Sequence, residues 1–280
     1  MRFSLILLFI LLALSLGNAQ IKTPQPSPFG TVTQLVGITE VSVEYSRPGI
    51  KDRVIFGDLV PYGKVWRTGA NESTKLKFST DVKLEGHPVP AGEYSLYTVP
   101  GEQDWKIIIN KKLDSRENHD ESADLLTFKV KSKLVPLPVE RFTIQIANMT
   151  DNSAQIILLW AQTEVPIKLE IDTDAMVMQS IEDFTNSDNT DNAGAWYSAA
   201  RYYFSNNKSK DDALDMVNKS LEIDDSPFWV LRLKAEILAA LEDYDEAVIF
   251  AKRSMVSAQK AGNDFYVQLN QKSIDEWSQK

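Results

Sequence analysis

The period of the apolar residues changes near Asp172, and this change limits the fold more than any other feature of the sequence. Across residues 31–171 apolar side chains recur at every second position, as in Val41, Val43 and Tyr45. Such alternation is typical of antiparallel strands with one solvent-exposed face. After Asp172 the apolar period becomes about 3.6 residues, which predicts α-helices. We therefore expect a β domain, an antiparallel sandwich or flattened barrel, followed by an all-α domain of helical hairpins.

The helical region contains a repeated pattern. Asp211–Leu214 and Asp245–Val248 are similar and lie 34 residues apart (211 to 245), while Ala200 and Ala235 lie 35 residues apart (200 to 235). The pattern resembles a pair of tetratricopeptide repeats, in which small residues let the two helices of a hairpin approach closely. An unrelated helical bundle is the alternative interpretation.

Turn and capping residues mark the ends of these helices. Ser226, followed by Pro227, predicts the start of one helix, and Asp264 predicts the start of the last. Gly262 stands where a glycine would end the helix between them.

The first residues have the pattern of an export signal. Arg2 is a short positive region, Leu5–Leu16 is apolar apart from one serine, and Gly17 and Ala19 are the small residues of a cleavage site before Gln20. An uncleaved membrane anchor would need about 20 apolar residues, and this stretch is shorter. No later segment is apolar enough over such a length, so we expect no membrane span after cleavage.

The chain contains no cysteine. Disulfides, thiolate metal sites and a cysteine nucleophile are therefore excluded. An exported protein without disulfides fits a bacterial envelope, so we expect a periplasmic or extracellular location.

Charge is unevenly distributed along the chain. Residues 20–164 contain 17 Lys and Arg against 18 Asp and Glu, a net charge of −1, and residues 165–280 contain 12 against 21, a net charge of −9. Neither part has the clustered cations that bind nucleic acid, so nucleic acid is not an expected partner. The predicted organisation is a signal peptide (residues 1–19), a β domain (residues 20–172) and a helical domain (residues 173–280).

Several motifs of the β region carry a resemblance to a known family. They include YSRP from Tyr45, VWRTGANE from Val65, PAGEY from Pro90, and Trp105. Over residues 28–171 the chain resembles the secreted bacterial family catalogued as domain of unknown function 2911. The resemblance implies a mainly β fold in exported proteins, often followed by helical repeats. The family carries no established activity, so the resemblance implies no catalytic residues.

Candidate ligand-binding residues gather around the stretch from Leu59 to Phe78. An arginine fork and an asparagine amide suit sugar hydroxyls or carboxylates, and a tryptophan offers a stacking face. The predicted site contains Tyr45, Arg47, Tyr62, Trp66, Arg67, Asn71 and Glu72. In the alternative interpretation Trp66 lies in the core, Arg67 pairs with Glu72, and the motif only shapes a β-corner.

Enzymatic interpretations find less support in the sequence. A glycosidase needs two carboxylates, for which Glu72 could combine with Glu44 or Asp81. A Ser-His-Asp triad has only His87 and His119 available, and no Gly-x-Ser-x-Gly motif is present. The histidines and carboxylates show no recognised metal-ligand spacing, so neither a metal nor a cofactor is predicted.

These observations favour an exported, non-catalytic binding protein. We expect the β domain to contact a glycan or peptide and the helical repeats to contact a protein partner. Two alternatives stay open: a cell-envelope carbohydrate hydrolase with Glu72 as acid or base, and a structural envelope protein without a ligand.

The first testable prediction concerns export. We expect the chain to be cleaved before Gln20, because a positive residue, an apolar stretch and two small residues precede that position. Mass spectrometry of the protein recovered from its own cell envelope measures the N-terminus directly. An intact Met1 or Arg2 N-terminus would contradict the prediction.

Overall fold

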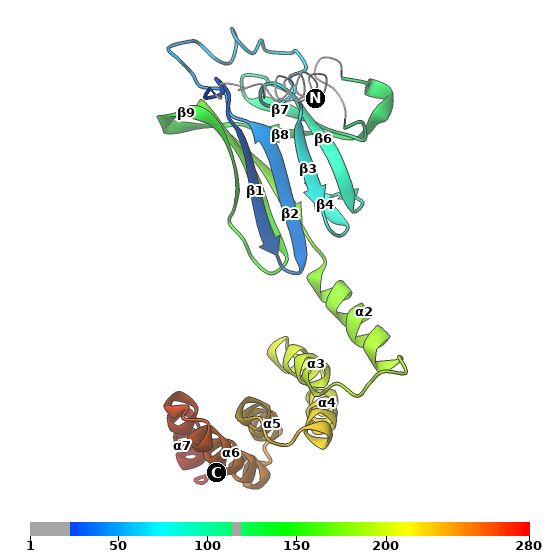
Figure 1. Ribbon diagram of the computed structural model, residues 1–280, viewed down its shortest axis with the longest axis vertical. Coiled ribbons are helices and arrows are strands. Elements are labelled where there is room, and N and C mark those ends of the chain that lie inside the picture. The colour runs from blue at the N-terminus through cyan, green and yellow to red at the C-terminus, as the bar shows by residue number, and fades with distance from the viewer. Residues whose placement is uncertain (1–22, 114–118) are drawn as a thin grey trace, which may run out of the picture. The chain divides into compact units, whose positions relative to one another are not determined.

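A computed structural model of the protein describes residues 23–113 and 119–280, so the predicted signal peptide lies outside the described residues. The chain forms two compact units, one ending at Asp174 and the other beginning at Ala175. The first unit consists of strands and the second of helices (Figure 1). This arrangement confirms the predicted fold class, a β domain followed by an all-α domain.

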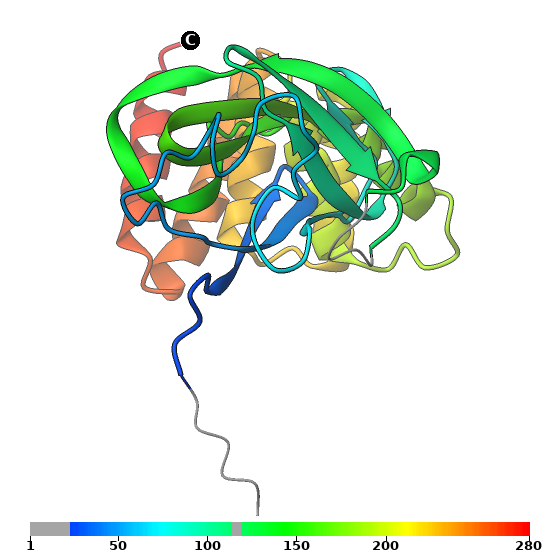
Figure 2. The same cartoon turned by 90° about the horizontal axis from the view of Figure 1, so that it is seen from above.

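The described strands of the β unit form two antiparallel sheets. In spatial order the six-stranded sheet contains β1 (Phe29–Val36), β2 (Thr39–Ser46), β3 (Thr74–Phe78), β6 (Gly92–Val99), β7 (Asp104–Asn110) and β8 (Asp124–Lys131). The four-stranded sheet contains β5 (His87–Val89), β4 (Val82–Leu84), β10 (Ser153–Glu170) and β9 (Lys133–Ala147). Figure 1 shows β1, β2, β3 and β6 side by side, and Figure 2 shows the long green strands β9 and β10 curving across one side of the unit.

The alternation in the sequence matches the two faces of the larger sheet. In β2 the side chains of Val41, Val43 and Tyr45 are buried, whereas Glu40 and Glu44 are exposed. Successive side chains of a strand point to opposite faces, so the valine face packs against the second sheet and the glutamate face is the outer face. The Tyr45 ring confirms the direction, because it contacts a phenylalanine of β9, with ring centroids 5.7 Å apart.

An aromatic cluster fills the space between the sheets. Trp105 of β7, Phe142 of β9 and Trp160 of β10 meet Phe56 and Trp66 from the long connection between β2 and β3. Ring centroids lie 4.9 Å apart for Phe56 and Trp105, and 5.2 Å apart for Trp66 and Phe142. Large aromatic side chains dominate core energetics, and truncating one typically costs about 3–5 kcal/mol. The β2–β3 connection is therefore part of the core at these two points.

The described helices follow the β unit in chain order. They are α2 (Thr173–Thr185), α3 (Ala193–Ser205), α4 (Lys210–Ile223), α5 (Phe228–Ala240), α6 (Tyr244–Lys260) and α7 (Asp264–Trp277). Gly262 has φ of +69° just after α6, as the prediction of a terminating glycine requires. None of the described helices is long and apolar enough to cross a membrane.

Two predicted helix caps are wrong by one residue. Pro227 occupies the N-cap position of α5, because the hydroxyl of Ser226 donates instead to Oδ1 of Asp224 at 2.6 Å. Asn263, not Asp264, caps α7, and its Oδ1 accepts a hydrogen bond from the α7 backbone at 3.1 Å. At α7 two neighbouring polar side chains compete for the same backbone donor, whereas the N-terminus of α5 has no side-chain cap because the Ser226 hydroxyl is committed to Asp224.

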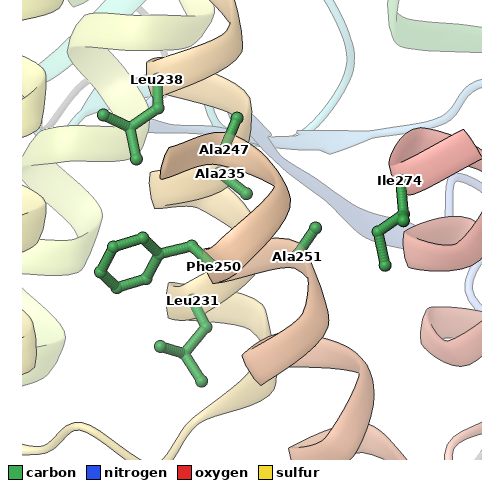
Figure 3. Packing of buried hydrophobic residues seen from close by; sticks show 7 residues of the cluster. All are labelled: Leu231, Ala235, Leu238, Ala247, Phe250, Ala251 and Ile274. Atoms are coloured by element: carbon green, nitrogen blue, oxygen red, sulfur yellow. The ribbon is translucent and has the colours of Figure 1, made fainter. Parts of the chain in front are cut away.

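The hairpins α3–α4 and α5–α6 each contain an equivalent hydrogen bond between their two helices. Ser220 of α4 donates to the carbonyl oxygen of Ala193 at 2.7 Å, and Ser254 of α6 donates to that of Phe228 at 2.7 Å. The serines lie 34 residues apart and the acceptors 35, which are the offsets of the sequence pattern. The small residues of that pattern are fully buried, namely Ala200, Ala213, Ala235 and Ala247. Figure 3 shows the apolar cluster that joins the second hairpin to α7.

The second testable prediction concerns the end of the β unit. Thr173 is buried and its hydroxyl donates a hydrogen bond to the carbonyl oxygen of Asp151. Gly37 packs so closely against these two groups that a Cβ at this position would clash with both. A chain truncated after Asp174 should therefore unfold cooperatively, with a β-type circular dichroism spectrum. A chain truncated after Asp172 should be about 0.5–1.5 kcal/mol less stable, because it loses this hydrogen bond. Molten products from both chains would show that the helices complete the β core.

Candidate functional site

Trp66 fixes the end of the β2–β3 connection. Its backbone N–H donates to Thr98 of β6 at 2.7 Å and its carbonyl accepts from Thr98 at 2.9 Å. Its indole Nε1 donates to the carbonyl oxygen of Gly69 at 3.0 Å, and its ring stacks on Trp160 with centroids 5.7 Å apart. Trp66 is therefore a partly buried member of the aromatic cluster that closes its own turn.

The turn after Trp66 has an unusual backbone. Thr68 has φ of +57°, Gly69 of +154° and Asn71 of +62°, a region that favours glycine. A Cβ on Gly69 would lie 3.1 Å from the carbonyl oxygen of Ser46, so the turn passes directly against the end of β2. Buried hydrogen bonds hold it there, including one from the Thr68 hydroxyl to Thr98 at 3.1 Å. The left-handed residues bring the start of β3 back beside β2.

A cleft of about 420 Å³ lies where this turn meets the larger sheet. Its walls come from the segment before β1, the start of β1, the end of β2, the turn and the start of β3. The lining residues are Gln25, Ser27, Phe29, Glu44, Tyr45, Ser46, Asn71, Glu72, Ser73 and Lys75. The volume lies within the range of small-molecule binding sites, about 300–1,000 Å³.

Three of the seven predicted site residues line this cleft. Asn71 and Glu72 are exposed there, and the amide nitrogen of Asn71 donates to the Ser46 hydroxyl at 3.1 Å. Tyr45 contributes part of the wall, but its hydroxyl is committed to β9, where it accepts from the Ile144 N–H at 3.0 Å. The structure thus brings Tyr45, Asn71 and Glu72 together.

The other four predicted residues do not line the cleft. Arg47 joins the two sheets, with its Nη2 donating to the hydroxyl of Thr143 at 2.8 Å. Tyr62 is 42% exposed, Trp66 belongs to the aromatic cluster, and Arg67 is exposed. Among the described residues no ion pair joins Arg67 to the glutamate of the turn, so the predicted alternative of a structural pair is not found.

The cleft is also lined by residues that are not among the seven predicted ligand-binding residues. Glu44 of β2 lies directly across from Lys75 of β3, and both line the cleft with the exposed ring of Phe29. Alternation along each strand places Glu44 and Lys75 on outer faces. Their adjacency depends on the pairing of β2 with β3, which the sequence alone does not reveal across so long a connection.

A polar row continues from the cleft across the outer face of the larger sheet. In the register of the strands, Glu44 lies opposite Lys75, Lys75 opposite Ser95, Ser95 opposite Asn110, and Asn110 opposite Asp124. Cross-strand partners share a face, so these five residues lie in one line over five strands. The first two are at the cleft, whereas Ser95 and Asn110 are buried, 0% and 1% exposed. The row therefore has an open half and a covered half.

Hydrogen bonds organise the covered half. Nδ2 of Asn110 donates to Oδ1 of Asp124 at 2.7 Å, and His119 Nε2 lies 2.7 Å from the same oxygen. The His119 ring packs on Tyr97, with centroids 5.1 Å apart. Burial raises the pKa of the Tyr97 hydroxyl, while its hydrogen bond with Ser73 lowers that pKa and the charge of Asp124 raises it. Ser73 also lines the cleft, so it connects the two halves.

This network does not have the connections of a Ser-His-Asp triad. The serine nearest the centre, Ser95, donates to the carbonyl oxygen of Lys112 at 2.8 Å and shares a second hydrogen bond with Ser73 at 3.0 Å. In the part of the chain that the structure describes, no hydrogen bond joins His119 to a serine. No group of three or more histidine or acidic side chains suited to a metal ion occurs among the same residues.

The fold and the cleft together define a class of protein: a two-sheet antiparallel β domain with a polar cleft on the outer face of its larger sheet, followed by helical hairpins. Residues 27–169, just over half of the chain, match the family described as "Protein of unknown function (DUF2911)". The chain belongs to this family, as its motifs predicted. A search of curated proteins found no match.

The third testable prediction separates two neighbours in the motif. Trp66→Ala should lower the free energy of unfolding by about 3–5 kcal/mol, because it removes a ring from the aromatic cluster. Arg67→Ala should change it by only about 0.5 kcal/mol or less, because the side chain is exposed. Urea denaturation of both variants beside the parent measures the difference. A loss for Arg67→Ala as large as that for Trp66→Ala would contradict this description of the turn.

Proposed function

We propose that this protein is an exported, non-catalytic binding protein whose β domain holds a glycan in the cleft beside the turn. The observation that carries the proposal is the excess of hydrogen-bond acceptors in the cleft. Among the described residues of the lining, Glu44 supplies a carboxylate, Oδ1 of Asn71 accepts no hydrogen bond, and Lys75 is the single cation. Sugars present many hydroxyl donors, which such a set of acceptors suits.

The apolar part of the cleft supports the same ligand class. The Phe29 ring is 65% exposed at the edge of the cleft, where it can cover the C–H face of a sugar ring. The N–H and C=O groups of an extended peptide alternate in fixed directions, whereas a sugar hydroxyl can rotate to donate wherever an acceptor lies. A glycan therefore fits the cleft better than a peptide does.

For the helical unit we propose tetratricopeptide-like hairpins that contact a protein partner. The matched serine–carbonyl hydrogen bonds at Ser220 and Ser254 support this, because they recur at the repeat offset. Stacked helical hairpins form extended surfaces that proteins commonly use for binding. The export pattern and the absence of cysteine support a bacterial periplasmic or extracellular location.

The fourth testable prediction concerns the cleft. Glu44→Gln and Glu72→Gln should each weaken glycan binding by about tenfold or more, because each removes a charged acceptor while leaving the side-chain shape unchanged. Glu93→Gln is the matched control, since Glu93 is exposed on β6 but does not line the cleft. A glycan array identifies a ligand of the parent, and calorimetry with that ligand compares the variants. Binding of peptides alone, or equal loss in the Glu93 control, would overturn the proposal.

A second candidate function follows from one specific observation: Glu44 and Glu72 line the same cleft. Hydrolysis of a glycosidic bond requires two carboxylates, one of which protonates the leaving oxygen. To test this, the parent protein is incubated with the glycan that it binds, and the release of reducing ends is measured. Release by the parent that disappears in Glu72→Gln would establish a hydrolase, and binding without release would exclude one for that glycan.

A further inference from the structure

Two adjoining clefts open on the helical unit, and together we call them the α4–α6 groove. The larger, about 520 Å³, is lined by Asp225, Ser226, Leu231, Lys252, Arg253, Val256, Ser257 and Lys260. The smaller, about 430 Å³, is lined by Asn218, Leu221, Glu222, Asp225, Lys234, Phe250 and Arg253. Asp225 and Arg253 belong to both, so one extended ligand can occupy the two clefts together.

Two cations share one aromatic ring in the smaller cleft. Nζ of Lys234 lies 3.8 Å from the centroid of the Phe250 ring, and the guanidinium carbon of Arg253 lies 5.0 Å from it. The ring extends from α6 on the side away from Ile274 of α7 (Figure 3). Burial lowers the pKa of Lys234, the Glu246 carboxylate raises it and the Arg253 charge lowers it. An anion between the two cations would relieve their repulsion.

An unpaired acceptor lies in the same cleft. Oδ1 of Asn218 is buried and has no hydrogen-bond partner among the residues that the structure describes. A buried carbonyl oxygen without a donor is unfavourable, and such groups in folded proteins call for an explanation. A ligand N–H would satisfy it once the Asn218 side chain turns toward the cleft that the residue lines.

The charge of the groove is opposite to that of the unit around it. Residues 175–280 contain 11 Lys and Arg against 18 Asp and Glu, a net charge of −7. Four of those cations line the groove, against two carboxylates, those of Glu222 and Asp225. Asp225 holds Arg253 at 3.4 Å in an exposed ion pair, so a ligand carboxylate can take its place.

We infer that the α4–α6 groove binds an acidic peptide segment of a protein partner. Its carboxylates would pair with Lys234 and Arg253 over the Phe250 ring and with Lys252 and Lys260 farther along, and a main-chain N–H would reach Oδ1 of Asn218. A long polyanion such as nucleic acid or an anionic membrane would meet the acidic surface of the unit, whereas a short segment meets only the groove. The inference rests on the proposed protein-binding role of the helices and is independent of the glycan cleft.

Fluorescence polarisation of the purified chain with a short fluorescein-labelled peptide of alternating glutamate and alanine tests the inference. We expect saturable binding, and about tenfold or greater weakening in Lys234→Met and in the exposed double variant Lys252→Gln with Lys260→Gln. Asn218→Leu should also weaken binding, because it removes the acceptor for the main-chain N–H. Lys272→Gln, an exposed change on α7 outside the groove, is the matched control and should bind like the parent. Thermal unfolding of each variant identifies any that fails to fold, and the exposed double variant keeps the test decisive if Lys234→Met does so.

Three outcomes of the peptide measurements would overturn the inference. They are absence of binding, equal binding of the same peptide with glutamine in place of glutamate, and equal weakening in the Lys272 control. Tighter binding to phosphatidylglycerol vesicles than to the peptide would also overturn it, because it would assign the groove to lipid. Glu72→Gln, a change in the glycan cleft, should leave peptide binding unchanged, so failure of one proposal is distinguishable from failure of the other.

Discussion

The packing of Trp66 between the two sheets determines where the rest of the candidate site can lie. Its ring contacts Phe142 and Trp160 of the smaller sheet, and its backbone pairs with Thr98 of the larger one. With that end fixed, the chain can enter β3 only by a sharp reversal, which Gly69 makes against the end of β2. The reversal carries the polar residues that follow it onto the outer face of the sheet. The cleft is thus a consequence of core packing, and the strained backbone of the turn persists because the aromatic cluster holds Trp66 at one end and the pairing of β3 with β2 holds the other.

The period of the apolar residues predicted the two units because it reflects local geometry. A strand turns its side chains alternately, and a helix repeats every 3.6 residues, so burial of one face leaves a signal in short stretches of sequence. The predicted site residues, by contrast, fall into two groups, those that line the cleft and those that do not. Trp66 forms an isolated bridge with Thr98 and its side chain is partly buried in the aromatic cluster, whereas the neighbouring Arg67 is exposed to solvent.

The remaining features depend on contacts between distant segments, which local patterns do not encode. Glu44 and Lys75 are neighbours only because β2 pairs with β3 across the long connection, and Asp124 joins their row only after two more strands. In the helical unit the sequence showed the small residues of the repeated pattern. The groove could not be predicted, because its lining combines side chains from α4, α5 and α6, which the tertiary structure brings together. Asn218 and Lys234 are unremarkable in the sequence, and only the tertiary structure shows a buried acceptor and a partly buried cation in one cleft.

The two proposed binding surfaces differ in chemistry, and this difference limits what each can take. Among the described residues, two carboxylates and one ammonium group line the cleft of the β unit, a balance that disfavours an acidic peptide there. The α4–α6 groove presents four cations and an aromatic ring already occupied by two of them, so a neutral glycan would leave their repulsion in place. Each surface discriminates against the ligand proposed for the other by unfavourable charge as well as by missing hydrogen-bond partners. Under the two proposals, a carbohydrate and an acidic peptide would therefore not compete for the same surface.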